Sequence, residues 1–196
     1  MNKIKTIAVY CGSSLGKSKI YQDKAIALGK TIYDNDINLV YGGGNIGLMG
    51  VIANTVLQLG GKVTGVLPHF LNKKEVGNLA ITELILVDSM HERKLKISEL
   101  SDAFIAMPGG FGTLEEVTEM LTWSQLGLSK KPIGLYNVNR YYNLLLQQFD
   151  KMVEEGFLKM ENRKIVIADH QPDLLLQKLY AFEPIVTPKW LHSDQT

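Results

Sequence analysis

Two segments carry residues whose types and spacing could support chemistry, "SMHERK" (residues 89–94) and "PGGFGTLEE" (residues 108–116). Three glycines in the second segment come directly before a patterned stretch that begins with Glu115 and Glu116. Flexible backbone before a helix lets the first amide groups point at an anion, which the helix dipole also favours. Thr113 and Glu116 also have the T-x-x-E spacing of a capping box, which alone would explain both residues. An anion site and a helix cap therefore stay open as alternatives.

The first segment supplies cations near the start of a predicted helix. Ser89 and Glu92 have capping-box spacing, so we expect this helix to begin near Met90. Arg93 and Lys94 then lie about one turn in, where a cation without a partner is unfavourable by roughly 0.3–1 kcal/mol. We expect an anionic partner for them, either a ligand phosphate or the last glutamate of "PGGFGTLEE". A solvated surface pair is the alternative.

Two further glycine loops depart from familiar nucleotide-binding motifs. The loop "CGSSLGKS" has Cys11 where a P-loop requires glycine, although Gly12 and Ser13 still offer donors at a strand end. Residues 42–47 contain G-x-G-x-x-G, but they follow the second expected strand, and no acidic residue lies about 20 positions further on. This loop predicts either close helix packing or a contact with phosphate or ribose.

The remaining inventory of reactive side chains is sparse. The four histidines lack the spacing of metal ligands, so no metal site is expected. No serine has the setting of a nucleophile elbow. An anion cradle, an arginine and a carboxylate suit hydrolysis of a nucleotide at its sugar better than acyl transfer or redox chemistry.

Short β-rich runs alternate with longer stretches of helical period along the chain. This pattern predicts an α/β fold, with a parallel sheet of about seven strands covered by helices on both faces. We expect a single domain over residues 1–182 and a C-terminal tail over 183–196. Because ligands gather at the carboxyl ends of parallel strands, we expect the site at that edge. The expected strands are residues 6–12, 37–44, 63–68, 83–88, 103–110, 132–137 and 164–169, and the expected helices are 18–36, 47–60, 90–101, 113–127, 140–156 and 172–181.

Composition restricts the possible partners. The chain has 196 residues, 45% of them hydrophobic, and a formal net charge of +1. Such a balance favours neither nucleic acid nor an anionic membrane surface as a partner. A single cysteine excludes an internal disulfide framework and fits a reducing compartment, and no apolar run reaches the roughly 20 residues of a membrane span. We therefore expect a cytoplasmic protein.

The paired motifs "MHERK" and "PGGFGTLEE" resemble the signature of the Lonely Guy (LOG) family, the cytokinin-activating phosphoribohydrolases, once labelled possible lysine decarboxylases. The segments "CGSS", "YGGGNIGLMG" and "LTWSQLG" also match, so the resemblance covers nearly the whole chain. It implies a Rossmann-like, doubly wound fold and a homodimer without a cofactor. It also implies hydrolysis of the N-glycosidic bond of N6-substituted adenosine 5'-monophosphate, a nucleoside 5'-monophosphate, to free base and ribose 5-phosphate.

The resemblance implies that Arg93 and Glu116 are the catalytic pair. Loss of the base leaves oxocarbenium character on the ribose, which a carboxylate can stabilise directly or by activating water. A guanidinium is a poor proton donor, so orientation and charge are the favoured roles for the arginine. The residues and the resemblance together predict a nucleotide site formed by Gly12, Ser13, Gly42, Gly43, Gly44, Glu75, Met90, Lys94, Gly109, Gly110, Phe111, Gly112, Thr113, Leu114, Glu115 and Thr122, in addition to the catalytic pair.

Other functions stay open at this stage. A nucleosidase acting on plain AMP would use the same core, and a non-catalytic nucleotide carrier would need the cradle without the acid. Lysine decarboxylation would require a Schiff-base lysine, and no lysine has an identifiable setting for one. The segments "EMLTW" and "LTWSQLG" predict either a dimer contact or core packing through Met120 and Trp123.

Overall fold

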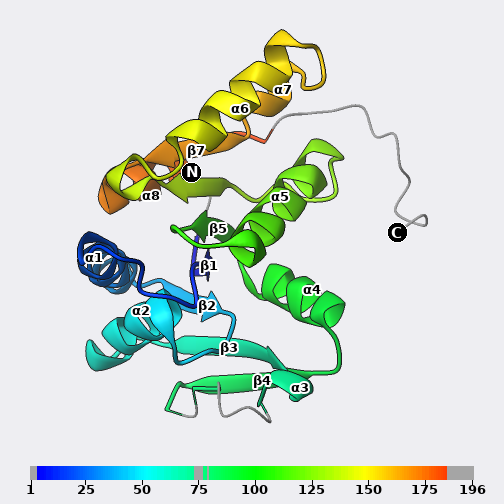
Figure 1. Cartoon of the computed structure of the whole chain (residues 1–196). Coiled ribbons are helices and arrows are strands. Elements are labelled where there is room, and N and C mark those ends of the chain that lie inside the picture. Colours follow the sequence, from blue (N-terminus) through cyan, green and yellow to red (C-terminus); the bar gives the residue numbers. More distant parts are fainter. Residues whose placement is uncertain (1–3, 73–76, 79, 185–196) are drawn as a thin grey trace.

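The computed structural model describes residues 4–72, 77–78 and 80–184 (Figure 1). Its centre is a seven-stranded sheet in which all paired strands are parallel, in the order β4-β3-β2-β1-β5-β6-β7. All seven expected strands are confirmed, each within the range that the sequence predicts. They are β1 Thr6–Tyr10, β2 Asn38–Tyr41, β3 Val63–Pro68, β4 Glu83–Val87, β5 Ala103–Ala106, β6 Ile133–Tyr136 and β7 Val166–Asp169.

The six expected helices are also confirmed, and three further elements were not predicted. These three are single turns, too short to show a helical period in the sequence. They are α3 His69–Asn72, the 3-10 turn η1 Val138–Arg140 and α7 Met160–Arg163. The longer helices are α1 Ile20–Asp34, α2 Gly47–Gln58, α4 Met90–Leu100, α5 Phe111–Gln125, α6 Asn143–Glu154 and α8 Pro172–Tyr180.

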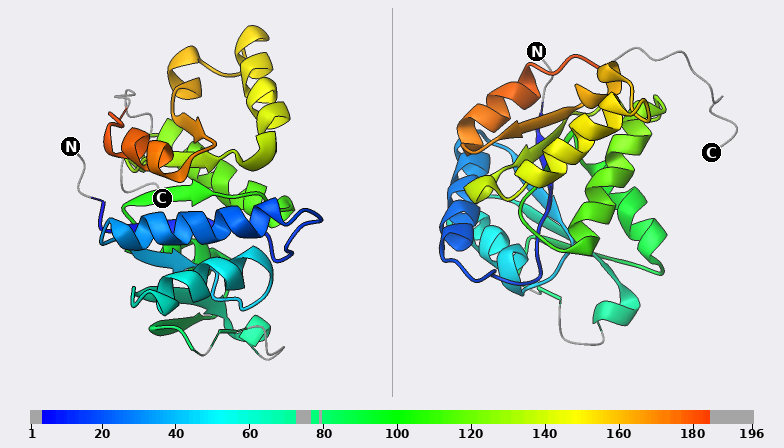
Figure 2. Two further views of the ribbon diagram at one scale, coloured as in Figure 1. Left: turned by 90° about the vertical axis from the view of Figure 1, so that its left-hand side faces the viewer. Right: turned by 45° about the horizontal axis from the view of Figure 1, so that its top comes forward.

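Side chains of the central strand β1 point alternately to the two faces of the sheet, and the core accordingly has two layers. Ile7 and Val9 of β1 join a cluster with α1, α2 and α8, whereas Ala8 and Tyr10 join one with α4, α5 and α6. Figures 1 and 2 show these helices on opposite faces of the sheet. Burial of apolar surface on both faces, worth roughly 25 cal/mol per Å², is the main force holding the helices against the sheet. The predicted doubly wound architecture is confirmed.

The chain reverses direction across the sheet at β1. From β1 it proceeds outward through β2, β3 and β4, then crosses to β5 on the other side of β1 and continues to β7. The loops after β1 and β5 therefore separate at their carboxyl ends, which is the topological switch point where such sheets bind ligands. The amide of Gly12 donates to the carbonyl of Pro108 at 3.1 Å across this point.

The loop before α2 is packed against the loop after β1. Gly47 has φ +59°, and a Cβ there would lie 2.2 Å from the carbonyl carbon of Ser13. The amide of Leu48 donates to the carbonyl of Gly12 at 3.0 Å. Of the two interpretations of this loop, close packing explains Gly47.

Most of the predicted C-terminal tail, residues 185–196, lies outside the described residues, and the boundary between residues 182 and 183 stays a prediction. The connection between β3 and β4 begins with α3, and its residues 73–76 and 79 lie outside the described residues. Within the described ranges, no helix has both the length and the apolar character needed to cross a membrane.

Candidate active site

The start of α5 forms one wall of the candidate site. Gly110 is the N-cap and makes no side-chain cap, so the capping-box alternative for Thr113 and Glu116 is wrong. The first hydrogen bond of the helix runs from the amide of Leu114 to the carbonyl of Gly110. The preceding helical amides, those of residues 111–113, donate to no acceptor in the described part of the chain. They are available to an anion.

A contact between Thr113 and Gly109 explains why the glycine loop takes this path. A Cβ on Gly109 would lie 2.1 Å from the hydroxyl oxygen of Thr113 and 2.9 Å from the amide nitrogen of Gly12. The hydroxyl of Tyr141 also donates to the carbonyl of Gly109 at 2.6 Å. The turn is therefore fixed from three sides, and its geometry is prepared before any ligand binds.

The second wall is the start of α4, where the predicted cap by Ser89 is confirmed, while the Glu92 carboxylate binds the amide one residue before the cap. The hydroxyl of Ser89 accepts from the amide of Glu92 at 3.1 Å, and the carboxylate of Glu92 accepts from the amide of Asp88 at 2.9 Å. The helix begins at Met90, as predicted, and its first turn directs Arg93 toward the ends of β2 and β3.

Arg93 is held by backbone carbonyls from two strand ends. Its Nε donates to the carbonyl of Val66 at 3.1 Å, and Nη2 donates to that of Gly42 at 3.2 Å. A Cβ on Gly42 would lie 1.9 Å from Nη2, so only glycine leaves room for the guanidinium. The remaining nitrogen, Nη1, lies 3.7 Å from Oε1 of Glu116. Since both side chains are only 12% exposed, the alternative of a solvated surface pair is wrong for Arg93.

Glu116 is a buried carboxyl group whose pKa is raised above its ordinary value. Burial raises its pKa to about 7, although the nearby charge of Arg93 acts in the opposite direction. Glu115 raises this pKa further, and Lys94 lowers it. The group therefore changes charge near neutral pH, which is typical of carboxyl groups that act in catalysis.

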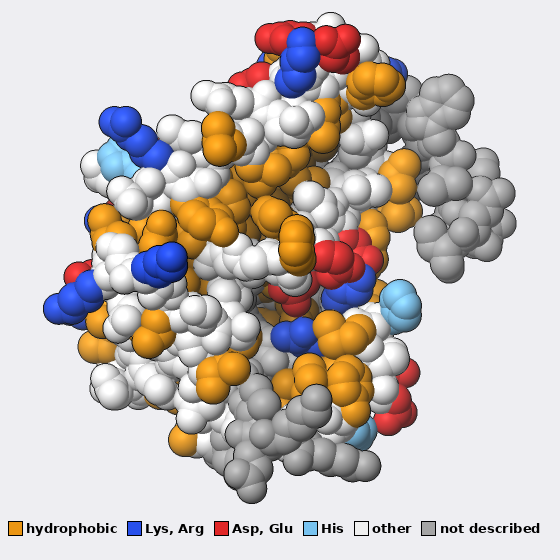
Figure 3. All heavy atoms as spheres, viewed as in Figure 1, with side chains coloured by type: hydrophobic (Ala, Val, Ile, Leu, Met, Phe, Trp, Pro, Cys, Tyr) orange, Lys and Arg blue, Asp and Glu red, His pale blue; other side chains and the backbone are white. Residues whose placement is uncertain are grey.

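Lys94 interacts with two carboxylates other than that of Glu116. Its Nζ lies 2.5 Å from Oε1 of Glu115 and 3.1 Å from Oε1 of Glu119, and the residue is buried. The hydrogen bond to Glu115 raises the pKa of this amine despite some burial. Figure 3 shows acidic and basic side chains gathered over α4 and the start of α5. Of the two expected cations, Arg93 therefore has Glu116 as its anionic partner, whereas Lys94 has Glu115 and Glu119 instead.

These walls enclose a cleft of about 340 Å³ at the switch point. A second cleft of about 380 Å³ adjoins it on the side of α1 and shares Gly12, Ser13 and Gly110 with it. The first cleft brings together ten of the predicted site residues, which are Gly12, Ser13, Met90, Arg93, Gly110, Phe111, Gly112, Thr113, Glu115 and Glu116.

Other predicted site residues lie elsewhere. The carbonyl of Gly43 accepts from the amide of Asn78, and Gly44 pairs with Gly77, so both face this neighbouring segment. Leu114 packs against the core, and the hydroxyl of Thr122 donates to the carbonyl of Thr118 further along α5. Neither of these last two lines the cleft. Gly109 lines the adjoining cleft, and Glu75 lies outside the described residues.

Sequence reasoning missed two residues of the first cleft, Cys11 and Met49. Both could have been found by position, since Cys11 follows β1 and Met49 lies in the first turn of α2 at the same sheet edge. Sequence reasoning also did not find Tyr21 and Tyr141, which line the second cleft. These two rings lie 6.2 Å apart in an edge-on arrangement that brings distant parts of the chain together.

Within the described ranges, no group of three or more histidine, cysteine, aspartate or glutamate residues could hold a metal ion. The site instead consists of backbone donors, one arginine and one buried carboxyl group. Its fold and position define a Rossmann-like protein with a cleft at the topological switch point.

The comparison with known proteins then identifies the family. Residues 49–179 match the family described as possible lysine decarboxylase. The chain is 46% identical to cytokinin riboside 5'-monophosphate phosphoribohydrolase LOG5 of Arabidopsis thaliana, over 94% of this chain and 81% of that protein. It is 47% identical to the probable cytokinin riboside 5'-monophosphate phosphoribohydrolase LOGL2 of Oryza sativa subsp. japonica, over 93% and 75%. The chain belongs to this LOG family.

Solved structures with low sequence identity share the fold. The molybdenum cofactor binding protein of Rippkaea orientalis superposes with a TM-score of 0.68 at 22% identity, covering 91% of this chain and 97% of that one. The Moco carrier protein of Chlamydomonas reinhardtii gives 0.67 at 20% identity, with 91% and 99% covered. At this identity the likeness concerns the fold alone.

Burial of Glu116 predicts a measurable dependence of stability on pH. The pKa of Glu116 is raised from about 4.5 in the unfolded chain to about 7 in the folded protein. The neutral carboxyl group therefore contributes its full share to the free energy of unfolding below pH 4.5, and this contribution is lost as the pH rises through about 7. We expect Glu116→Gln to leave the free energy of unfolding nearly unchanged at pH 4 and to raise it at pH 8, on the order of 2 kcal/mol.

Urea denaturation of both proteins at several pH values measures this difference. Glu115→Gln is the matched control, because that carboxylate is half exposed and bonded to Lys94. If the free energies of unfolding of native protein and Glu116→Gln differed by the same amount at pH 4 and at pH 8, the account of a buried carboxyl group would be contradicted.

Proposed function

We infer that this protein is a phosphoribohydrolase that cleaves the N-glycosidic bond of a cytokinin riboside 5'-monophosphate, releasing the base and ribose 5-phosphate. The observation that carries the inference is the buried carboxyl group of Glu116 facing Arg93 across a cleft lined with free backbone donors. The relatives named above, identical at 46–47% of positions over most of this chain, support the same activity.

The position of Glu116 suits the charge that develops in this reaction. As the bond to the base breaks, positive charge grows on the ribose, and a nearby carboxylate stabilises it electrostatically. With its pKa near 7, the same group can also accept a proton from the attacking water at neutral pH. Both roles require the ionised form, which the charge of Arg93 favours.

The start of α5 supplies backbone amides that can bind the substrate phosphate. The free amides of Phe111, Gly112 and Thr113 point into the cleft wall at the positive end of a 15-residue helix. Ser13 adds a hydroxyl at the adjacent end of β1. A phosphate held there would place the ribose between the glycine loop and the catalytic pair. Among the predicted binding residues, Lys94 instead has a role in holding α4 against α5.

Two other functions fit the site less well. A Schiff-base lysine must become an uncharged nucleophile, whereas Lys94 is bonded to two carboxylates and its pKa is raised. This argues against the decarboxylase that the family description suggests. A nucleotide carrier would need the cradle but would gain nothing from a buried carboxyl group, whose ionisation opposes folding.

We also propose a homodimer formed through the face of α5 and α6. Met120 belongs to the core at 1% exposure, so the dimer contact expected of it is better explained by core packing. Other hydrophobic side chains are exposed on this face, and Figure 3 shows them over α5 and α6. Phe111, Leu144 and Phe157 are 93%, 79% and 87% exposed, more than an isolated chain has reason to leave in water. The single cysteine, Cys11, is buried and fits a cytoplasmic location.

Sedimentation of the full chain tests the dimer. We expect a dimer of the native protein and dissociation in a double variant, Leu144→Gln with Phe157→Gln, because the apolar contact is lost. Leu174→Gln, which changes an exposed leucine on α8, is the control. A native monomer at micromolar concentration would contradict the proposal.

Incubation of purified protein with N6-isopentenyl-AMP and with AMP, followed by chromatography, tests the reaction. We expect free base and ribose 5-phosphate in equal amounts, and comparison of initial rates then gives the base preference. Faster cleavage of plain AMP would favour the nucleosidase alternative. If neither nucleotide is cleaved while both raise the melting temperature, the carrier would replace the hydrolase.

Gly42→Ala tests the positioning of Arg93 apart from the fold. The added methyl group meets the far end of a flexible side chain, so we expect little change in the urea midpoint. Displacement of the guanidinium from Glu116 should lower kcat/KM by about 10- to 100-fold. A variant with native kcat/KM would show that this placement of Arg93 is unnecessary.

A further inference from the structure

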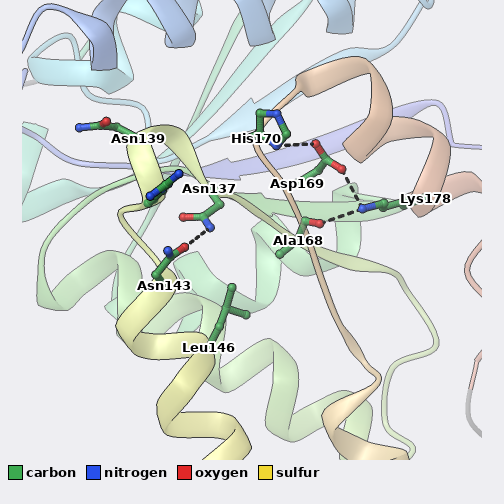
Figure 4. A pocket seen from close by; sticks show the side chains of 9 residues that line it. Asn137, Asn139, Asn143, Leu146, Ala168, Asp169, His170 and Lys178 are labelled. Carbon is green, nitrogen blue, oxygen red and sulfur yellow. Dashed lines mark hydrogen bonds and ion pairs between the residues drawn. The ribbon is translucent and has the colours of Figure 1, made fainter.

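A separate cavity of about 700 Å³ lies at the carboxyl ends of β6 and β7 (Figure 4). It shares no lining residue with either cleft at the switch point. Its walls come from the turn η1, the start of α6, the end of β7 and α8. Since ligands of parallel sheets bind at this edge, the position alone justifies asking what the cavity could hold.

On one wall, two amide side chains are fixed by each other and by the backbone. Asn137 donates through Nδ2 to Oδ1 of Asn143 at 2.8 Å, and its own Oδ1 accepts from the amide of Tyr142 at 2.8 Å. Figure 4 shows both amides on the side opposite Asp169 and Lys178. These bonds engage both amide oxygens and leave the Nδ2 group of Asn143 free to donate.

On the other wall, the only carboxylate of the cavity is already neutralised. Oδ2 of Asp169 lies 2.7 Å from Nζ of Lys178, and Oδ1 accepts from the amide of Gln171 at 2.9 Å. Nδ1 of His170 lies 3.5 Å from the same Oδ1. Lys178 donates a second bond to the carbonyl of Ala168 at 3.1 Å, which leaves its third proton unused.

Among the described side chains that line the cavity, the polar groups without a hydrogen-bond partner are therefore mainly donors. The guanidinium of Arg140 makes no hydrogen bond or ion pair within the part of the chain that the structure describes, and this residue has φ +60°. With Lys178 and Asp169 cancelling, Arg140 gives the cavity a net positive charge. Asn139 also lines the cavity, and Figure 4 shows its side chain pointing away from the other labelled side chains.

We propose that this cavity binds a small phosphate monoester, at a site separate from the catalytic cleft. Arginine binds phosphate oxygens through two parallel hydrogen bonds, and Asn143 and Lys178 line the same cavity with side chains that are donors for further oxygens. The cavity is larger than bare phosphate requires, and its polar lining, with only Leu146 and Ala168 apolar, suits a hydroxylated remainder such as a sugar. The proposal does not depend on the reaction assigned to the catalytic cleft.

Titration of the isotopically labelled full chain with ribose 5-phosphate and with inorganic phosphate, followed by amide NMR at constant ionic strength, tests the site. We expect saturable shifts for the amides of Asn137, Asn143 and His170, with ribose 5-phosphate the tighter ligand. Arg140→Gln should weaken this binding about tenfold or more. Lys159→Gln, which removes an exposed charge elsewhere, should leave it unchanged.

Asn143→Asp provides a second variant, because aspartate is well tolerated at the start of a helix and its charge would repel the ligand. Weaker binding in both variants supports the site. Shifts confined to residues 110–113, shifts that never saturate, or native affinity in Arg140→Gln would overturn it. Equal affinity for the two probes would overturn the assignment to a monoester.

Discussion

A guanidinium and a buried carboxyl group lie next to each other in the cleft at the switch point, close enough for electrostatic attraction and too far apart for a hydrogen bond. Carbonyls at the ends of β2 and β3 hold Arg93, whereas Glu116 comes from α5, which follows the central part of the sheet at β5. The 3.7 Å between them leaves the carboxylate free to interact with a substrate. The arrangement depends on the parallel sheet, because parallel strands place their carboxyl ends at one edge, and the strand order puts β1 between β2 and β5.

Holding the pair in place requires contacts that do not touch a ligand. Lys94 connects α4 to α5 through Glu115 and Glu119, so the helices that carry Arg93 and Glu116 are fixed relative to each other. The bond between Tyr141 and Gly109 attaches the glycine loop to the chain after β6. Because burial raises the pKa of Glu116, the ionised form that the proposed reaction uses is also the form that burial disfavours.

The sequence predicted the fold well because its signals are local. Seven β-rich runs and six helical periods suffice to predict the sheet, and the Ser89 cap places the start of α4 correctly. The site was predicted less completely. The partners of Lys94 depend on which residues of α5 face α4, a question of packing that spacing cannot answer. The glycines at 42 and 47 look alike in the sequence, yet one makes room for a guanidinium and the other for backbone.

The role of Glu116 is the central claim, and comparison of two adjacent carboxylates tests it most directly. The measurement is kcat for cleavage of N6-isopentenyl-AMP by Glu116→Gln and by Glu115→Gln, beside native protein. The account predicts a loss of at least about 1000-fold in Glu116→Gln and a loss of less than about tenfold in Glu115→Gln. Similar losses in both variants, or substantial activity in Glu116→Gln, would contradict it.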